Sequence, residues 1–87
     1  MYAIIVYDIS TERVTKVCHF LRQHLNWIQN SVFEGEITES QLEKIKHRLK
    51  ELTEVDCDSV IIYTTPSKDR IQKQHIGIIK NDPTTIL

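Results

Sequence analysis

Cysteine, glycine and proline are all scarce in this chain: each occurs only twice among 87 residues. Few glycines and prolines leave little room for long loops, so we expect most residues in helices and strands. Cys18 and Cys57 form no Cys-x-x-Cys pair, which argues against a zinc site or a redox pair. Both are expected to be reduced, buried thiols of a cytoplasmic protein. No basic leader with an apolar core is visible, and no apolar run approaches the ~20 residues that a membrane span needs.

The chain also lacks an excess of either charge, with 11 Lys and Arg against 12 Asp and Glu and a net charge of −1. A general polyanion binder would be basic, so a nucleic acid would have to meet a local basic patch. No glycine-rich phosphate loop, nucleophile elbow or triad order is present. The histidines lack a His-Glu-x-x-His pattern and are expected to be surface or interface residues: His19, His24, His47 and His75.

The remaining composition is that of a small globular protein, with 40% hydrophobic and 26% charged residues. This balance excludes disorder, and the length predicts one domain over residues 1–87. We expect its core in residues 1–65, and in residues 70–87 an edge strand and a segment that docks on a second copy.

Hydrophobic patterns predict the order β-α-β-β-α-β with an extra C-terminal strand. The predicted strands are 2–9, a hairpin within 27–37 that turns at Asn30-Ser31, 59–65 and an edge strand at 71–79. One helix, about 11–25, has Ser10 as its N-cap, and the other opens at the capping box Thr38–Gln41. This order predicts an α+β sandwich, with both helices on one face of an antiparallel sheet in the strand order 4-1-3-2.

The predicted strands 2–9 and 59–65 are apolar on both faces, but the helices can cover only one face. The other face carries Ile4, Val6 and Asp8, and we expect a second copy of the chain to bury it about a two-fold axis. The alternative is that the C-terminal segment folds back over its own sheet. The segment from about 76 to 87 is predicted to pack on the partner subunit.

One end of this sheet collects polar residues. Asp8, the hairpin turn and the start of the last core strand at Asp58-Ser59 should meet there, beside the beginning of the first helix. Asp8 either caps that helix or, paired with its copy across the two-fold axis, binds a hard divalent cation such as Mg²⁺. Such a cation can polarise a phosphoryl oxygen or activate a water molecule.

Basic residues on the two helices are candidates for phosphate contacts. On the first helix these are Arg13, Lys16 and Arg22. On the second helix, Lys44, Lys46 and Lys50 indicate a solvated face first and a DNA-backbone rail second.

Three segments together resemble the CRISPR-associated Cas2 family: Val6-Tyr7-Asp8-Ile9-Ser10, the block from Gln29 to Glu36, and Asp58 to Tyr63. The resemblance runs from Met1 to about Tyr63. It implies a ferredoxin-like fold, a homodimer and a role in CRISPR adaptation beside the Cas1 integrase. Many family members are described as Mg²⁺-dependent endonucleases on RNA or double-stranded DNA.

The family's metal-linked aspartate falls on Asp8, and its Ser-Val-Phe block falls on Ser31, Val32 and Phe33. Asp8 is therefore the expected catalytic and metal residue, with Ser10, Ser31 and Phe33 as neighbours. The chain departs from the family where several arginines often open the first helix, because here only Arg13 and Lys16 are basic. It also has Trp27 where a basic residue is common.

Two functions follow from the resemblance. One is a Mg²⁺-dependent endonuclease acting at Asp8 on double-stranded DNA or single-stranded RNA. The other is a non-catalytic dimeric scaffold that holds DNA and bridges dimers of the integrase. A weaker third interpretation is a regulatory or RNA-binding module. None of these places the protein in a membrane.

Overall fold

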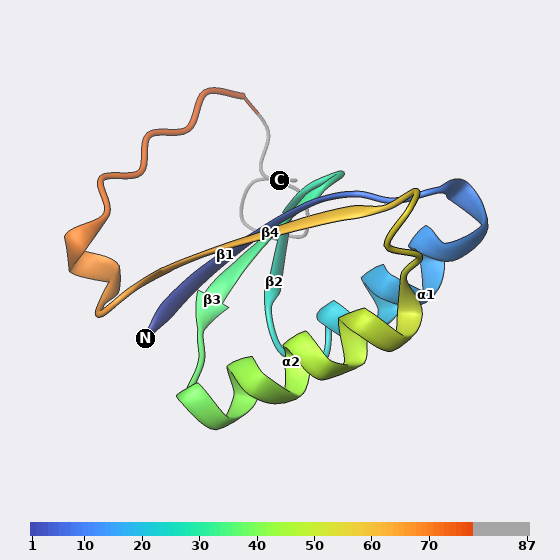
Figure 1. The fold of residues 1–87 in the computed structure, drawn as a ribbon. Helices are drawn as coiled ribbons and strands as arrows, with labels where there is room; N and C mark the ends of the chain where they lie inside the picture. The colour runs from blue at the N-terminus through green and yellow to red at the C-terminus, as the bar shows by residue number, and fades with distance from the viewer. Residues whose placement is uncertain (78–87) are drawn as a thin grey trace.

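The computed structural model of the protein describes residues 1–77 (Figure 1). Its elements follow the predicted order: β1 (Tyr2–Asp8), α1 (Thr11–Leu21), β2 (Asn26–Gln29), β3 (Val32–Glu36), α2 (Glu39–Leu52), β4 (Ser59–Thr65) and the short 3-10 helix η1 (Lys68–Arg70). The fold is therefore the predicted α+β sandwich.

The sheet has the order β2-β3-β1-β4, and every neighbouring pair is antiparallel. This is the predicted order, with β1 in the centre and β4 at an edge. Both helices pack on one face of the sheet, while the chain after β4 runs on the opposite side (Figure 1). The long β1–β4 pairing extends from Tyr2 opposite Thr65 to Asp8 opposite Ser59, so it fixes where Asp8 lies.

The core lies between the sheet and the helices. Alternate residues of β1 face the helices and are buried, namely Ala3, Ile5 and Tyr7. Phe33 is opposite Ile5 in the sheet, is 0% exposed, and stacks on Tyr7 with ring centroids 6.0 Å apart. The ring of Phe33, a predicted neighbour of the active site, therefore lies in the core, on the face of the sheet away from the Asp8 side chain.

The opposite face of the sheet carries apolar side chains that the helices do not cover. Ile4 is opposite Tyr63 and Val6 is opposite Ile61, so all four share this face. Ile61 is 48% and Tyr63 58% exposed. We call the surface of Ile4, Val6, Ile61 and Tyr63 the uncovered face, and Asp8 stands at its end.

The chain after β4 covers one end of the sheet on this side. Lys73 forms an ion pair with Glu34, which is only 5% exposed. Tyr2 beside them is buried, and its burial and the charge of Glu34 raise the pKa of Tyr2 to about 12. The alternative of a segment folding back on its own sheet is thus realised in part, at the end opposite Asp8.

Local sequence signals set the start of α2 but not the ends of α1. The Thr38 hydroxyl accepts the Gln41 N–H at 3.1 Å and the Gln41 side chain accepts the Thr38 N–H at 2.8 Å, which confirms the capping box. The Ser10 side chain makes no cap hydrogen bond. The helix ends at Leu21 rather than near Leu25, because Asn26 must already pair with Glu34 in the sheet.

Two further expectations differ from the structure. The predicted edge strand over 71–79 is absent from residues 71–77 of the single chain, and its remainder lies outside the described residues. Cys57 is exposed rather than buried, in the connection between α2 and β4, while Cys18 is half-buried with its Sγ 2.9 Å from the Tyr7 hydroxyl. Among the described residues, no helix has the length and apolarity needed to cross a membrane.

Candidate functional site

The end of the sheet where β1 stops brings together the segments that the sequence predicts there. The Tyr7 N–H donates to the Ser31 carbonyl at 3.1 Å, and the Tyr7 hydroxyl donates to the Asn30 carbonyl at 2.5 Å. The hairpin turn is therefore attached to the end of β1. On the other side, Asp8 is opposite Ser59, the first residue of β4. We call this region the Asp8 end of the sheet.

Asp8 itself is exposed at the edge of the uncovered face. Within residues 1–77 its carboxylate has no hydrogen-bond or ion-pair partner. The alternative that Asp8 caps α1 is therefore not supported, because a capping side chain accepts an N–H of the first helical turn. An exposed carboxylate without a partner, beside an apolar surface, is available to a ligand.

The residue at this end that could serve as a ligand of a hard cation is Asp8. No cluster of three or more His, Cys, Asp or Glu side chains that could hold a metal occurs in the described part of one chain. Mg²⁺ does not need one, since it keeps several waters and uses one or two carboxylates together with substrate phosphates. A second chain on the uncovered face would bring a second Asp8 carboxylate.

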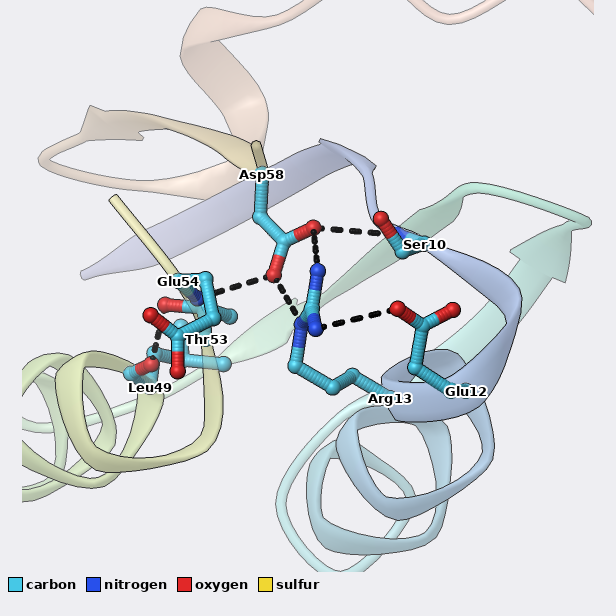
Figure 2. A network of polar contacts seen from close by, with 7 residues as sticks. All are labelled: Ser10, Glu12, Arg13, Leu49, Thr53, Glu54 and Asp58. Carbon is cyan, nitrogen blue, oxygen red and sulfur yellow. Dashed lines mark hydrogen bonds and ion pairs between the residues drawn. The ribbon is translucent and has the colours of Figure 1, made fainter. Parts of the chain in front are cut away.

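Beside Asp8 lies a network around the Asp58 carboxylate (Figure 2). The Arg13 Nε donates to Oδ2 at 2.6 Å and its Nη2 donates to Oδ1 at 3.0 Å. The backbone N–H groups of Ser10 and Glu54 donate at 3.0 and 2.9 Å. The Asp58 side chain is 0% exposed. We call these four residues the Asp58 network; Asp58 and Arg13 are 45 positions apart, so no local pattern signals it.

The Arg13 guanidinium makes hydrogen bonds within the protein. Hydrogen bonding to Asp58 occupies one edge of its guanidinium and raises its pKa, and its Nη1 contacts Glu12 at 3.2 Å. The side chain is only 22% exposed. The structure thus gives Arg13 an internal partner, where the sequence indicated a contact to phosphate.

The other basic residues differ in their exposure and in their side-chain partners. Lys16 is exposed on α1 and, with His19 and Arg48, lines a cavity between the two helices. Arg22 lies over the Trp27 ring, with its guanidinium carbon 4.5 Å from the ring centroid. On α2, three side chains pair with glutamates of the same helix, as on a solvated face: Lys46 with Glu43, and His47 and Arg48 with Glu51.

The predicted neighbours Ser10 and Ser31 both lie at the Asp8 end of the sheet and are half-buried. Of the histidines, His19 and His47 are exposed, and His24 packs edge-on against Phe20 at 5.1 Å. His75 is half-buried in the segment after η1. The structure therefore gathers Asp8, Ser10 and Ser31, and leaves the histidines away from that group or on the surface.

The Asp58 network predicts a component of acid sensitivity. The hydrogen bond from Arg13, with those from Glu54 and Ser10, holds the pKa of Asp58 well below its ordinary value of about 3.9. A carboxyl whose pKa is lowered on folding stabilises the protein at neutral pH and loses that effect as the pH falls below about 4. Asp58→Asn should therefore be less stable at pH 7, and its free energy of unfolding should fall less steeply toward about pH 2.

Urea denaturation of both proteins at several pH values measures these slopes. Asp56→Asn, a change at an exposed residue of the same connection, is the control and should keep the slope of the unmodified protein. Parallel slopes for Asp58→Asn and the unmodified protein would contradict the assignment.

The sequence profile described as CRISPR associated protein Cas2 matches residues 1–73. A CRISPR-associated endoribonuclease Cas2 of Pyrococcus furiosus is 52% identical over 81 residues, which cover 93% of each chain. That of Methanosarcina acetivorans is 46% identical over 87 residues and all of both chains. A crystal structure of Cas2 has a TM-score of 0.84 and 44% identity, covering 94% of this chain and 92% of that one. Streptococcus pyogenes Cas2 at pH 6.5 has a TM-score of 0.73 and 28% identity, covering 86% and 100%.

Proposed function

This chain belongs to the CRISPR-associated Cas2 family, and from that premise we propose that it is a homodimeric, Mg²⁺-dependent endonuclease whose catalytic residue is Asp8. The observation that carries the proposal is the position of Asp8. It is an exposed carboxylate without a partner in residues 1–77, at the end of an apolar face that the helices leave uncovered.

Burial of the uncovered face by a second copy supports the dimer. Ile61 and Tyr63 are large apolar side chains that are about half exposed in one chain, and a two-fold axis would pair them with the same surface of the partner. The same axis would bring two Asp8 carboxylates toward each other. Two neighbouring carboxylates repel each other unless a cation or a proton lies between them.

The residues at the Asp8 end of the sheet would bind the cation and the substrate. Asp8 and its copy would hold the cation, which when bound polarises a phosphoryl oxygen and lowers the pKa of a water. The hairpin turn fixes the end of β1 through Tyr7. Ser10 and Ser31, which are half-buried at the same end, would donate hydrogen bonds to a phosphodiester. RNA is the preferred substrate in this proposal, because relatives at 52% and 46% identity are named endoribonucleases.

A dimeric scaffold in CRISPR adaptation is the second candidate function. In that role the protein would bridge dimers of the Cas1 integrase and hold DNA during spacer insertion. It is favoured by the finding that residues 1–77 contain no cluster of three or more side chains that could hold a metal, because a scaffold needs only the two-fold face. We place either role in the cytoplasm, where the free thiols of Cys18 and Cys57 would stay reduced.

The test is a cleavage assay with labelled single-stranded RNA and double-stranded DNA of the same sequence. We expect cleavage of RNA with Mg²⁺ and none after treatment with EDTA. Cleavage of DNA alone would change the substrate but keep the site. Stable binding of Cas1 without cleavage of either nucleic acid would refute the nuclease and support the scaffold.

Nucleic-acid binding by this dimer should be sequence-independent and should weaken as salt rises, because phosphate contacts release counterions. Lys16 is exposed on α1, whereas Arg13 donates to Asp58 and Arg22 lies over the Trp27 ring. Lys16→Ala should therefore lower the salt slope of log affinity by about 1 for each phosphate that this lysine neutralises. Titrations of labelled duplex at several salt concentrations measure the slope. Thr15→Ala, an exposed neutral neighbour, is the control; an unchanged slope in Lys16→Ala would remove this residue from the interface.

A further inference from the structure

The Asp58 carboxylate joins the beginning of α1 to the connection between α2 and β4, two segments that are distant in sequence. Its four donors come from Ser10 before α1, from Arg13 within α1, and from Glu54 after α2. Figure 2 shows these groups converging on the two oxygens from different sides. A carboxylate offers about four acceptor positions, so this one is saturated. Its side chain is withdrawn from water, which is tolerated only because every oxygen is paired.

The Asp58 network lies next to Asp8, because two of its residues flank the paired ends of β1 and β4. Asp58 comes one residue before Ser59, which is opposite Asp8 in the sheet, and Ser10 follows Asp8 closely in the chain. The hydrogen bond from the Ser10 N–H to Asp58 therefore closes a small loop over the end of β1. The other side of β1 is held at Tyr7 by the hairpin turn. Asp8 thus lies between Tyr7, which is hydrogen-bonded to the hairpin turn, and Ser10, which is hydrogen-bonded to Asp58. Its own side chain has no partner among the described residues.

We propose that Asp58, held in place by two hydrogen bonds from Arg13, is a positioning residue. It fixes the direction in which the Asp8 carboxylate points on the uncovered face. The inference rests on the proposed function, in which Asp8 is the catalytic residue. Reacting groups must be held within about 0.5 Å of the productive geometry, and an exposed residue at the end of a strand gets such rigidity only from its neighbours. Partners that orient a metal ligand are typically worth about 10–100-fold in metal affinity or activity.

A merely structural role for Asp58 has to be distinguished from positioning. Asp58 accepts the Ser10 N–H, a bond at the entrance to α1 in a helix whose Ser10 side chain makes no cap bond. If stabilising the start of α1 were its whole task, Asp58→Asn would lower the melting temperature without changing turnover by the molecules that remain folded. Positioning predicts a change in turnover at a temperature where every variant is folded.

The kinetic test compares Asp58→Asn, Arg13→Gln and the double variant with Glu12→Gln. Glu12 is the matched control, because it touches Arg13 from the exposed side and leaves all four bonds to Asp58 in place. We expect kcat for labelled RNA to fall about 10–100-fold in Asp58→Asn and in Arg13→Gln, with KM nearly unchanged. The double variant should be no worse than either single one, since the two residues act as a unit. Glu12→Gln should stay within about 2-fold of the unmodified protein.

A second measurement does not depend on cleavage. Backbone order parameters from NMR should fall at Asp8 and Ser10 from the rigid value of about 0.85 toward 0.6 in Asp58→Asn and remain rigid in Glu12→Gln. If Asp58→Asn is folded and keeps both rigid order parameters and kcat, the inference is overturned. If the unmodified protein cleaves nothing, the proposed function fails, and the order parameters alone decide whether Asp58 positions Asp8. If Asp58→Asn does not fold, the same two measurements are made on Arg13→Gln, whose unchanged values would likewise overturn it.

Discussion

Replacement of Asp8 by Asn should abolish Mg²⁺-dependent cleavage and leave the protein folded and dimeric. Because the Asp8 carboxylate is exposed and has no partner among residues 1–77, an amide of the same shape removes no contact of the described fold. Asparagine lacks the charge that holds the cation. The loss should exceed the roughly 100-fold that is the upper range for residues one step removed from a metal.

The charge has a second consequence in the dimer. Without a cation, two Asp8 carboxylates that face each other across a two-fold axis repel, so the neutral variant should melt at an equal or slightly higher temperature when EDTA is present. With Mg²⁺ added, the melting temperature of the unmodified protein should rise and that of Asp8→Asn should stay the same.

Melting temperature and cleavage are measured on the same preparation of Asp8→Asn. Asp56→Asn is the matched control, since it neutralises another exposed aspartate near this end of the sheet and should retain full cleavage. Full cleavage by folded Asp8→Asn would exclude Asp8 from the active site. In that case the scaffold would be the better account, and integration of a labelled spacer by the variant together with the Cas1 integrase would test it directly.

The parts of the fold that depend on local signals could be predicted from the sequence. Strand β4, the hairpin turn at Asn30-Ser31 and the capping box of α2 all lie where short-range patterns place them. The strand order followed from the order of the elements and brought Asp8 beside the hairpin turn and the start of β4. The position of Asp8 beside these two segments could therefore be predicted from the sequence.

The predictions that differ from the structure concern residues whose contacts are made with partners distant in sequence. Phe33 lies in a motif segment, but its face is decided by its pairing with Ile5. Arg13 looked like a surface cation because nothing nearby in sequence indicates Asp58, 45 positions away. The role of Asp58 was missed for the same reason. A carboxylate before a strand has no distinguishing pattern until the fold brings four donors to it.

The uncovered face should be an obligatory part of the proposed active site, and Ile61→Glu tests this. Ile61 is 48% exposed in one chain, so glutamate there should leave the monomer fold intact. In a dimer the same side chain would lie in a buried apolar contact, where an unpaired charge costs several kcal/mol. The variant should therefore sediment as a particle of one 10.2 kDa chain, and the unmodified protein as twice that mass.

Loss of the dimer should also remove cleavage, although Ile61→Glu leaves Asp8 and the Asp58 network unchanged. A monomer retains a single Asp8 carboxylate and no other cluster of metal-binding side chains in residues 1–77. Ser40→Glu, which adds the same charge at an exposed position of α2 on the other side of the sheet, should keep both the dimer and the activity. A monomeric Ile61→Glu that cleaves RNA at the normal rate would show that one chain suffices, and the cation would then need its remaining ligands from water and the substrate.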